Sequence, residues 1–378
     1  MVKLLMASTM RRVYGLVSWW RMSVRALCAS AIVLQGCGVD TSTTAATVTP
    51  TGYDVGSSLF GPEIAWVDNN QVLFIGQKSN LDPKERSYAA FKMYIWNEST
   101  KSVREHADAA HFFCYADSRI RYGYGKKDEA GNTIIHEGPL GKEEIITVPL
   151  APSHALRGFS YFSCKLYSSD DFVPPIPKDR QTLVLREGDG YLVLQPTGSA
   201  RSSYVAKNLI LYRGKGAEPV TLPMTWYGNI GLLTPQEITY SAYLRAYVLH
   251  QPTFESDQGP RDWPASEPRV VYVLRTSDGS VERVTIPPTT PFKRPKSTKV
   301  GWIYAGGLVR DGKWVGHNGL YLYDGNRQKK IEAGTIGAIT VSPDGCKAAV
   351  AVNNYSHIPM LGTPTTLKIF NFCAVTKR

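Results

Sequence analysis

The stretch "ITVSPDGCKAAVAV", Ile339 to Val352, decides the fold. Two runs of β-branched and small apolar residues flank the four residues Ser-Pro-Asp-Gly. Pro343 presets its φ angle, Asp344 can bond its own backbone, and Gly345 can adopt a positive φ. Each property favours a tight reversal of the chain, so the stretch predicts a β-hairpin.

The same arrangement recurs from Ile64 onward, where apolar runs of strand length alternate with clusters of Gly, Asp, Asn and Ser. Such clusters between β-branched and aromatic runs are typical of hairpins. The clearest examples are "EIAWVDNNQVLFIG", "KMYIWNESTKSVREH", "TLVLREGDGYLVL", "LILYRGKGAEPVTL", "VVYVLRTSDGSVERVTI" and "KWVGHNGLYLYDGNRQKKI". We find no convincing pattern of a long amphipathic helix. The chain is therefore predicted to be all-β.

Grouped in fours, the strands form units of roughly fifty residues, a period typical of β-propeller blades. The units begin near Ile64, Phe112, Phe159, Ile238, Val300 and Ile336. We predict a β-propeller of about six four-stranded blades, or seven if Phe159 to Leu233 holds an extra sheet. Tyr53 to Phe60 are expected to pair with the last blade as its closing strand. The alternative is that the hairpins belong to another β fold.

The hairpin at Ile339 to Val352 resembles the TolB-type propeller repeat, in which Ser-Pro-Asp-Gly turns an inner strand back on its neighbour. The resemblance covers one motif in one blade, and the other units match only in pattern. It implies the same propeller fold that the repeated strands predict.

The N-terminal region has the pattern of a secretory signal. The segment "MSVRALCASAIVLQG", Met22 to Gly36, begins with a cation and continues with an apolar run too short to span a bilayer. The following "LQGC" resembles the lipobox of bacterial lipoproteins, which implies that Cys37 is the lipidated first residue of the mature chain. An ordinary thiol near a conventional cleavage site is the alternative. Translation begins at Met1 or at Met22, and the sequence does not decide between them.

The residues after Cys37 indicate where the protein resides. Gly38 resembles the signal for outer-membrane sorting, so we expect an outer-membrane lipoprotein of the bacterial cell envelope that faces the periplasm and contacts the membrane through its acyl chains, palmitate included. Thr41 to Gly52 are Thr-rich and have no apolar period, which predicts a flexible tether. The predicted organisation is leader and signal at 1–36, tether at 37–52 and propeller at 53–378.

The charge of the chain gives little support to a nucleic-acid partner. The 378 residues carry a formal net charge of +11. Five of the 43 basic residues and no acidic residue lie in 1–36, which leaves 38 basic against 32 acidic residues in the mature part, or +6. Because much of the excess belongs to the leader, we expect no nucleic acid as partner.

Four cysteines follow Cys37, an even number that suits two disulfides in an oxidising compartment. Four cysteines allow three pairings, among which the sequence alone does not choose. The propeller interpretation pairs Cys346 with Cys373, at facing ends of two neighbouring strands, and Cys114 with Cys164, in matching places of consecutive blades. Four buried free thiols are the alternative.

No motif for catalysis or metal binding is present. The histidines have neither HxH nor HExxH spacing, and we find no zinc-type Cys spacing, GxSxG, P-loop or GxGxxG in the right context. We therefore predict no catalytic residue, no metal and no cofactor. A propeller can assemble a site from distant blades, so an enzyme is not excluded.

Two cationic segments are candidate binding surfaces. "SRIRYGYGKKDEAGN" mixes cations with tyrosines, a combination that can bind anionic glycans or phosphates. Its cations are Arg119, Arg121, Lys126 and Lys127, and the alternative is a solvated strand and loop. "TPFKRPKSTK", Thr290 to Lys299, is predicted to be a Pro-rich loop that connects two blades or contacts anionic head groups.

These observations favour a lipid-anchored β-propeller that acts as a binding or scaffolding module, without catalysis, for an envelope protein or glycan. The alternative is a propeller enzyme, a hydrolase or lyase acting on envelope glycans or peptides. A third hypothesis is a structural subunit with an exposed apolar patch. Mixed aromatic and polar residues in the central funnel would favour binding, and converging ionisable groups with shifted pKa values would favour catalysis.

Overall fold

The computed structural model describes most of the chain from Ala46 to Ala374. The described residues are 46–58, 61–62, 64–82, 91–108, 112–116, 118–148, 183–187, 190–196, 206–213, 217–223, 238–250, 268–287, 292–306, 309–310, 313–314, 319–353 and 365–374. Every regular element among them is a β-strand. The prediction of an all-β chain is confirmed.

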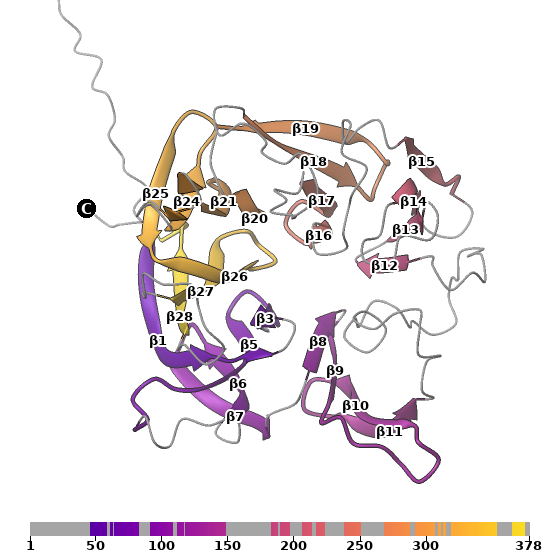
Figure 1. The fold of residues 1–378 in the computed structure, drawn as a ribbon, viewed down its shortest axis with the longest axis vertical. Helices are drawn as coiled ribbons and strands as arrows, with labels where there is room; N and C mark the ends of the chain where they lie inside the picture. Colours follow the sequence, from indigo (N-terminus) through magenta and orange to yellow (C-terminus); the bar gives the residue numbers. More distant parts are fainter. Residues whose placement is uncertain are drawn as a thin grey trace, which may run out of the picture. The chain divides into compact units, whose positions relative to one another are not determined.

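Four sheets contain four antiparallel strands each, paired in chain order (Figure 1). The first has β8 (Phe112–Ala116), β9 (Arg119–Gly123), β10 (Thr133–Pro139) and β11 (Glu144–Val148). The second has β12 (Leu183–Glu187), β13 (Gly190–Pro196), β14 (Ala206–Tyr212) and β15 (Val220–Pro223). The third has β16 (Ile238–Ser241), β17 (Ala246–His250), β18 (Arg269–Arg275) and β19 (Val281–Ile286). The fourth has β20 (Phe292–Thr298), β21 (Gly301–Gly306), β24 (Gly319–Tyr323) and β25 (Gln328–Ala333).

A fifth sheet has eight strands and joins the beginning of the described chain to its end. Its order is β26-β27-β28-β1-β5-β6-β7, and β4 pairs with β5. The strands are β1 (Thr47–Val55), β4 (Ile64–Trp66), β5 (Gln71–Lys78), β6 (Lys92–Asn97), β7 (Ser102–Asp108), β26 (Thr335–Val341), β27 (Lys347–Asn353) and β28 (Thr365–Asn371). β1 therefore completes the last blade, and β4 to β7 make up the first.

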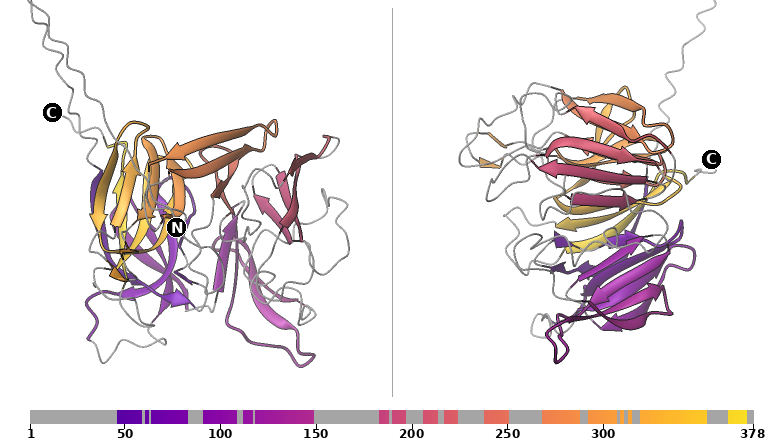
Figure 2. Two further views of the ribbon diagram at one scale, coloured as in Figure 1. Left: turned by 45° about the horizontal axis from the view of Figure 1, so that its top comes forward. Right: turned by 90° about the vertical axis from the view of Figure 1, so that its right-hand side faces the viewer.

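Two short hairpins accompany these sheets. They pair β2 (Ser57–Ser58) with β3 (Gly61–Pro62), and β22 (Val309–Arg310) with β23 (Lys313–Trp314). β3 also contacts β26. Figure 2 shows the same sheets from two further directions.

The closing strand begins earlier than predicted. Tyr53 to Val55 belong to β1, but the strand starts at Thr47, inside the predicted tether. The Thr51 hydroxyl donates a hydrogen bond to the carbonyl of Leu367 at 2.9 Å, and β-branched threonines suit a strand. Composition alone predicted a tether because the partner strand lies at the far end of the chain.

The first strands of four blades lie at or next to the predicted starts, namely β4, β8, β16 and β26. Another blade begins at Phe292 instead of Val300, because the cationic segment before Val300 is strand β20 and not a loop. Phe159 lies outside the described residues, and the first described strand after it is β12, which begins at Leu183. The described residues contain six four-stranded blades, which agrees with the prediction of about six.

Apolar clusters between successive sheets hold the blades together. In β5, Val72 and Phe74 pack in the cluster shared with β27 and β28. Their neighbours Leu73 and Ile75 pack in the cluster shared with β8 and β9. A strand buried on both faces has a continuous apolar sequence, as "VLFI" does here. Four-stranded sheets packed in series, with the last one completed by the N-terminal strand, form a β-propeller.

The Ser342–Gly345 turn joins β26 to β27 as predicted. The Gly345 amide donates to the Ser342 carbonyl at 2.8 Å, and Gly345 has a φ of 74°. One carboxylate oxygen of Asp344 accepts hydrogen bonds from the Ser342 hydroxyl at 2.6 Å and from the Cys346 amide at 3.0 Å. The turn is therefore closed by its own side chains.

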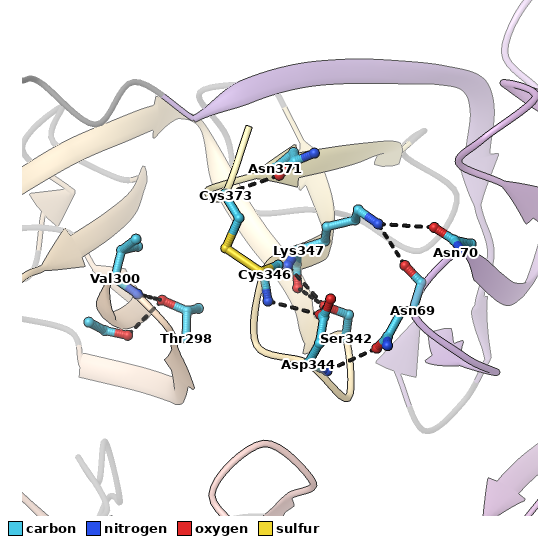
Figure 3. Close-up of a disulfide and its surroundings, with 11 residues drawn as sticks. Asn69, Asn70, Thr298, Val300, Ser342, Asp344, Cys346, Lys347, Asn371 and Cys373 are labelled. Atoms are coloured by element: carbon cyan, nitrogen blue, oxygen red, sulfur yellow. Dashed lines mark hydrogen bonds between the residues drawn. A yellow bond between two sulfur atoms is a disulfide. The ribbon is translucent and has the colours of Figure 1, made fainter. Parts of the chain in front are cut away.

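The same turn is bonded to the first blade (Figure 3). The Asp344 amide donates to the Asn69 side-chain oxygen at 2.9 Å. The Lys347 ammonium donates to the Asn69 carbonyl at 2.7 Å and to the Asn70 side chain at 3.1 Å. These bonds link the first and last blades beside the strand pairing of β1.

Candidate functional site

A recess lies where the first strands of three blades end, at β16, β20 and β26. Its volume, measured as space open to the centre of a water molecule, is about 50 Å³. The residues around it include seven with hydroxyl groups, one lysine, and no carboxylate or histidine. They are Thr239, Tyr240, Ser241, Ala242, Tyr243, Val248, Lys296, Ser297, Thr340, Val341 and Ser342.

Strand β20 brings its cations to this recess through a β-bulge. Lys293 pairs with Ala305 and Lys296 with Ile303, so the two residues between them face a single residue of β21. Pro295 has no amide hydrogen to donate, and a bulge is a position in a sheet that tolerates it. Arg294 has a φ of 55°, in the left-handed region that is uncommon for residues other than glycine.

Among the described residues, the two cations at the bulge lack a carboxylate partner. In the part of the chain that the structure describes, no ion pair involves Arg294 or Lys296. Burial, followed by the positive charge of Arg294, lowers the pKa of Lys296 to about 8. Burial also lowers the pKa of Arg294, although its side chain keeps accessible surface.

The frame around the recess is held by backbone and ring contacts. The Trp66 indole of β4 donates to the Thr340 carbonyl at 3.1 Å, which fixes β26 against the first blade. The Lys299 amide donates to the Gly345 carbonyl at 2.9 Å, which fixes the end of β20 against the turn after β26. A Cβ at Gly345 would lie 2.7 Å from the Tyr243 ring, so the turn of the third sheet packs closely on it. The recess therefore has fixed walls.

The sequence matches no protein-family model and no curated protein. Solved structures of propeller type resemble the fold at low identity. An oligogalacturonate lyase from Vibrio parahaemolyticus is 11% identical with a TM-score of 0.49, over 87% of this chain and 94% of that one. The β-propeller domain of the Trilobed protease from Pyrococcus furiosus is 12% identical with a TM-score of 0.33, over 77% and 78% of the two chains.

An acylaminoacyl peptidase from Pyrococcus horikoshii is 13% identical with a TM-score of 0.45, over 83% of this chain and 52% of that chain. Likeness at this level carries no activity from these proteins to this one. The assignment of the fold rests on the strand order and register described above.

The anion site predicted at Arg119, Arg121, Lys126 and Lys127 is not assembled as one uncompensated cluster. Arg121 is buried and bonds the Glu137 carboxylate, with its Nε at 2.7 Å, and Arg119 lies 3.7 Å from the same carboxylate. Lys126 lies over the Tyr124 ring, 5.9 Å from its centroid. The carboxylate offsets both arginines because it lies between them, so we do not place a binding site there.

The predicted pairing of Cys346 with Cys373 is present, with the two Cα atoms 5.2 Å apart (Figure 3). The strands run antiparallel, with Lys347 opposite Asn371, and this register sets the two cysteines at facing ends. Cys114 on β8 is also disulfide-bonded. Its predicted partner Cys164 and the predicted lipidation site Cys37 lie outside the described residues.

The remaining ionisable groups do not assemble into a recognisable catalytic or metal site among the residues that the structure describes. There, no group of three or more His, Cys, Asp or Glu side chains is placed to hold a metal ion. His106 Nε2 lies 3.3 Å from the Glu143 carboxylate, and burial lowers the pKa of His106. His136 stacks on Tyr122 at 4.7 Å between centroids. Within the described ranges no helix is long and apolar enough to cross a membrane.

The sequence identifies the cationic segment that contains Lys296 but predicts a loop where the structure has a strand. Thr290 to Lys299 was predicted as a loop because the segment is cationic and rich in Pro. A proline between cations in a segment that follows "VERVTI" is compatible with a bulged strand, which is what β20 is. The sequence holds no signal that brings β16 and β26 to the same recess.

Proposed function

We propose that this protein is a lipid-anchored β-propeller that binds a partner at the bacterial cell envelope and does not itself catalyse a reaction. The partner is an envelope protein or glycan. The proposal combines the propeller fold, the recess at the ends of β16, β20 and β26, and the lipobox-like "LQGC" at Cys37.

The observation that carries the proposal is the composition of the recess. Hydroxyl groups, two tyrosines and Lys296 surround it, and Arg294 lies close enough to lower the pKa of Lys296. These groups bind and orient polar ligands through hydrogen bonds and charge. A hydrolase of the common kinds needs a nucleophile hydrogen-bonded to a base, a pair of carboxylates, or a metal; the lining has no carboxylate and no histidine, and no hydrogen bond between a lining serine and Lys296 is seen among the described residues.

Lipidation of Cys37 would keep the propeller close to the membrane. Cys37 and the first residue of β1, Thr47, are ten positions apart. Ten residues of fully extended chain reach at most about 35 Å. The propeller would therefore meet partners at the membrane surface, such as other anchored proteins or nearby glycans.

One observation favours the enzyme alternative, a hydrolase or lyase acting on envelope glycans or peptides. A lysine whose pKa is lowered to about 8 can act as a general base near neutral pH. Tyr240 lines the same recess and is a hydroxyl that could donate a proton. This alternative predicts turnover that is lost when Lys296 is replaced by Met.

Membrane fractionation and partner capture test the proposal. The full-length protein, with Cys37 and with Cys37→Ser, is expressed in a bacterial host supplied with labelled fatty acid. We expect label and outer-membrane fractionation for the wild type, and neither for the variant. The purified full chain in detergent is then screened for capture of envelope proteins and glycans and for turnover of ester, glycoside, phosphate and peptide substrates. Turnover would refute the non-catalytic function, and unlabelled wild-type protein would refute the anchor.

A further inference from the structure

We propose that the recess between β16, β20 and β26 binds one small oxyanion, a carboxylate or a phosphate group carried by the ligand. This inference rests on the proposed binding function and names the chemical group that the site takes. Four features of the described residues carry it: uncompensated charge, a bulge that places that charge, hydroxyl donors, and size.

The charge of the recess is positive and unopposed. Lys296 lines it, Arg294 is close enough to act on Lys296, and no carboxylate is among the lining residues. Two neighbouring cations repel each other, and partial burial removes water that would screen them. An anion bound beside Lys296 would offset this repulsion and the loss of water, so we expect the recess to favour a negative group.

The backbone of β20 is distorted at the point where the cations lie. Arg294 adopts a φ of 55°, and the bulge between Lys293 and Lys296 interrupts the pairing with β21. Bulges next to functional sites re-aim side chains, and a non-glycine residue in this region costs energy. An undistorted β20 would pair Arg294 with Tyr304 and would place Lys296 in another register. The distortion is therefore tied to the position of the cations.

Hydroxyl groups supply further donors on the other walls. Thr239 on β16 and Thr340 on β26 are half-buried and line the recess, and Ser297 follows Lys296 on β20. A hydroxyl can donate to an anion and accept from a cation, which suits a group held between ammonium and oxyanion. No side chain of the lining carries a negative charge that would repel the oxyanion.

The size of the recess limits the ligand group. One water molecule needs about 10 to 15 Å³ of space measured in this way. The volume of about 50 Å³ holds a few such atoms. A carboxylate or a phosphate has that many heavy atoms, whereas a whole sugar ring does not fit. The recess therefore holds the charged group of a larger ligand that extends beyond it.

Protonation of Lys296 should govern the affinity. The titratable groups around it are Arg294 on its own strand and the phenols of Tyr240 and Tyr243 from the third sheet, and Asp344 follows the lining residue Ser342 in the turn after β26. The Asp344 carboxylate is occupied by the Ser342 hydroxyl and the Cys346 amide. Because Lys296 loses its proton near pH 8, binding of an anion should weaken as the pH rises from 7 to 9.

The test titrates the purified full chain with acetate and with inorganic phosphate at constant ionic strength. Binding is followed by calorimetry and by the rise in melting temperature that a ligand of the folded state produces. We expect Lys296→Met to weaken both anions at least about tenfold, the loss of one charge-assisted hydrogen bond. Arg294→Asn, which retains a residue that tolerates positive φ, should weaken them too. Lys299→Met, a neighbouring cation outside the recess, should change the affinity less than about twofold.

Three larger probes distinguish which anionic group, carboxylate or phosphate, the recess prefers. Glucuronate offers a carboxylate, glucose 6-phosphate a phosphate, and glucose neither. The anion that binds more tightly names the class, and glucose should not bind. For acetate, the affinity of the wild type should fall at least about threefold from pH 7 to pH 9, and that of Lys296→Met should not change.

Two results would overturn the inference. One is equal affinity of the wild type and Lys296→Met for both anions. The other is no binding by the wild type at anion concentrations of about 50 mM. If an envelope partner is captured equally well by Lys296→Met, the inference fails and the proposed function stands. If the anions bind as expected but the chain captures no envelope partner, the proposed function fails and the oxyanion site stands. Ser297→Ala with Thr239→Val provides a second, uncharged test if Lys296→Met does not fold.

Discussion

The Ser342–Gly345 turn and strand β20 lie against each other, yet they differ in whether their polar side chains have bonding partners. The Lys299 amide at the end of β20 donates to the Gly345 carbonyl, so the two regions share a hydrogen bond. In the turn, the Asp344 carboxylate and the Ser342 hydroxyl have partners, and the Asp344 amide donates to the Asn69 side chain of the first blade. In β20, Arg294 and Lys296 have no carboxylate partner among the described residues.

The difference separates residues that stabilise the fold from residues available to a ligand. Buried polar groups are nearly always partnered, and an exception calls for an explanation. The turn follows the rule, since its bonds fasten the last blade to the first. β20 is different, because the accessible Arg294 and the partly buried Lys296 have no carboxylate partner among the described residues and the backbone is distorted, a pattern that we interpret as a site for an opposite charge.

The largest expected effect comes from the disulfide that closes the last blade. Replacing Cys346 and Cys373 together by Ser should lower the free energy of unfolding by about 3 kcal/mol, because the bond closes a loop with a sequence separation of 27. Denaturant unfolding of wild type and variant under oxidising conditions measures the loss. A loss below about 1 kcal/mol would mean that the bond adds little to the turn and β1 pairing.

The next effect concerns the close contact between the turn and the third sheet. Gly345→Ala should lower the free energy of unfolding by about 2 kcal/mol, since the residue has φ +74° and its new Cβ would lie 2.7 Å from the Tyr243 ring. Gly131→Ala is the matched control, because Gly131 has φ +83° and nothing within 4 Å. It should cost only about 1 kcal/mol. Equal losses in the two variants would remove the role assigned to Tyr243.

A smaller effect is expected where the turn is bonded to the first blade. Asn69→Ala removes the acceptor of the Asp344 amide and should cost about 1 kcal/mol. Asn70→Ala removes only an exposed acceptor of the Lys347 ammonium and should cost less than about 0.5 kcal/mol. Thermal unfolding of both variants compares the two bonds. A larger loss for Asn70→Ala than for Asn69→Ala would contradict the assigned roles.

Much of the fold could be predicted from local sequence. Hairpins such as "SPDG" and "VDNN" are set by residues with distinct φ preferences, and these act over a few positions. The pairing of Cys346 with Cys373 followed from the propeller interpretation, and the register of β27 with β28 agrees with it. The start of β1 was placed too late because Thr47 finds its partner, Asn371, at the other end of the chain.

The candidate site could not be predicted in the same way. The recess unites Thr239, Lys296 and Thr340, which lie on three blades, and no local pattern reports that distant strands converge. The charge clusters of the sequence do not show which cations have a carboxylate partner. Glu137 lies opposite Arg121 on the neighbouring strand β10 and offsets its charge, whereas Lys296 has no carboxylate partner among the described residues. Only the fold distinguishes the two.

The central claim, that β20 holds cations at a cost to stability while the turn gains stability from its polar groups, predicts effects of opposite sign. Burial raises the pKa of Asp344, but the Ser342 hydroxyl, the Cys346 amide and neighbouring lysines together lower it by a larger amount. The net pKa is therefore lowered, and the ionised form is favoured on folding. Folded Lys296, with its pKa lowered to about 8, binds its proton less tightly than the unfolded chain does. The free energy of unfolding of the wild type should therefore gain a contribution from Lys296 as the pH rises above about 8.

The direct measurement is the free energy of unfolding, by denaturant, of wild type, Asp344→Ala and Lys296→Met at pH 7 and again at pH 9.5. At pH 7 we predict that Asp344→Ala lowers it by about 1 kcal/mol and that Lys296→Met raises it by somewhat less than about 1 kcal/mol. At pH 9.5 the gain from Lys296→Met should shrink, since Lys296 of the folded wild type is then mostly neutral. Lys329→Met, which removes an exposed cation of β25 in the same sheet, is the control and should leave both values unchanged. A loss of stability in Lys296→Met at pH 7, the same sign as in Asp344→Ala, would contradict the account.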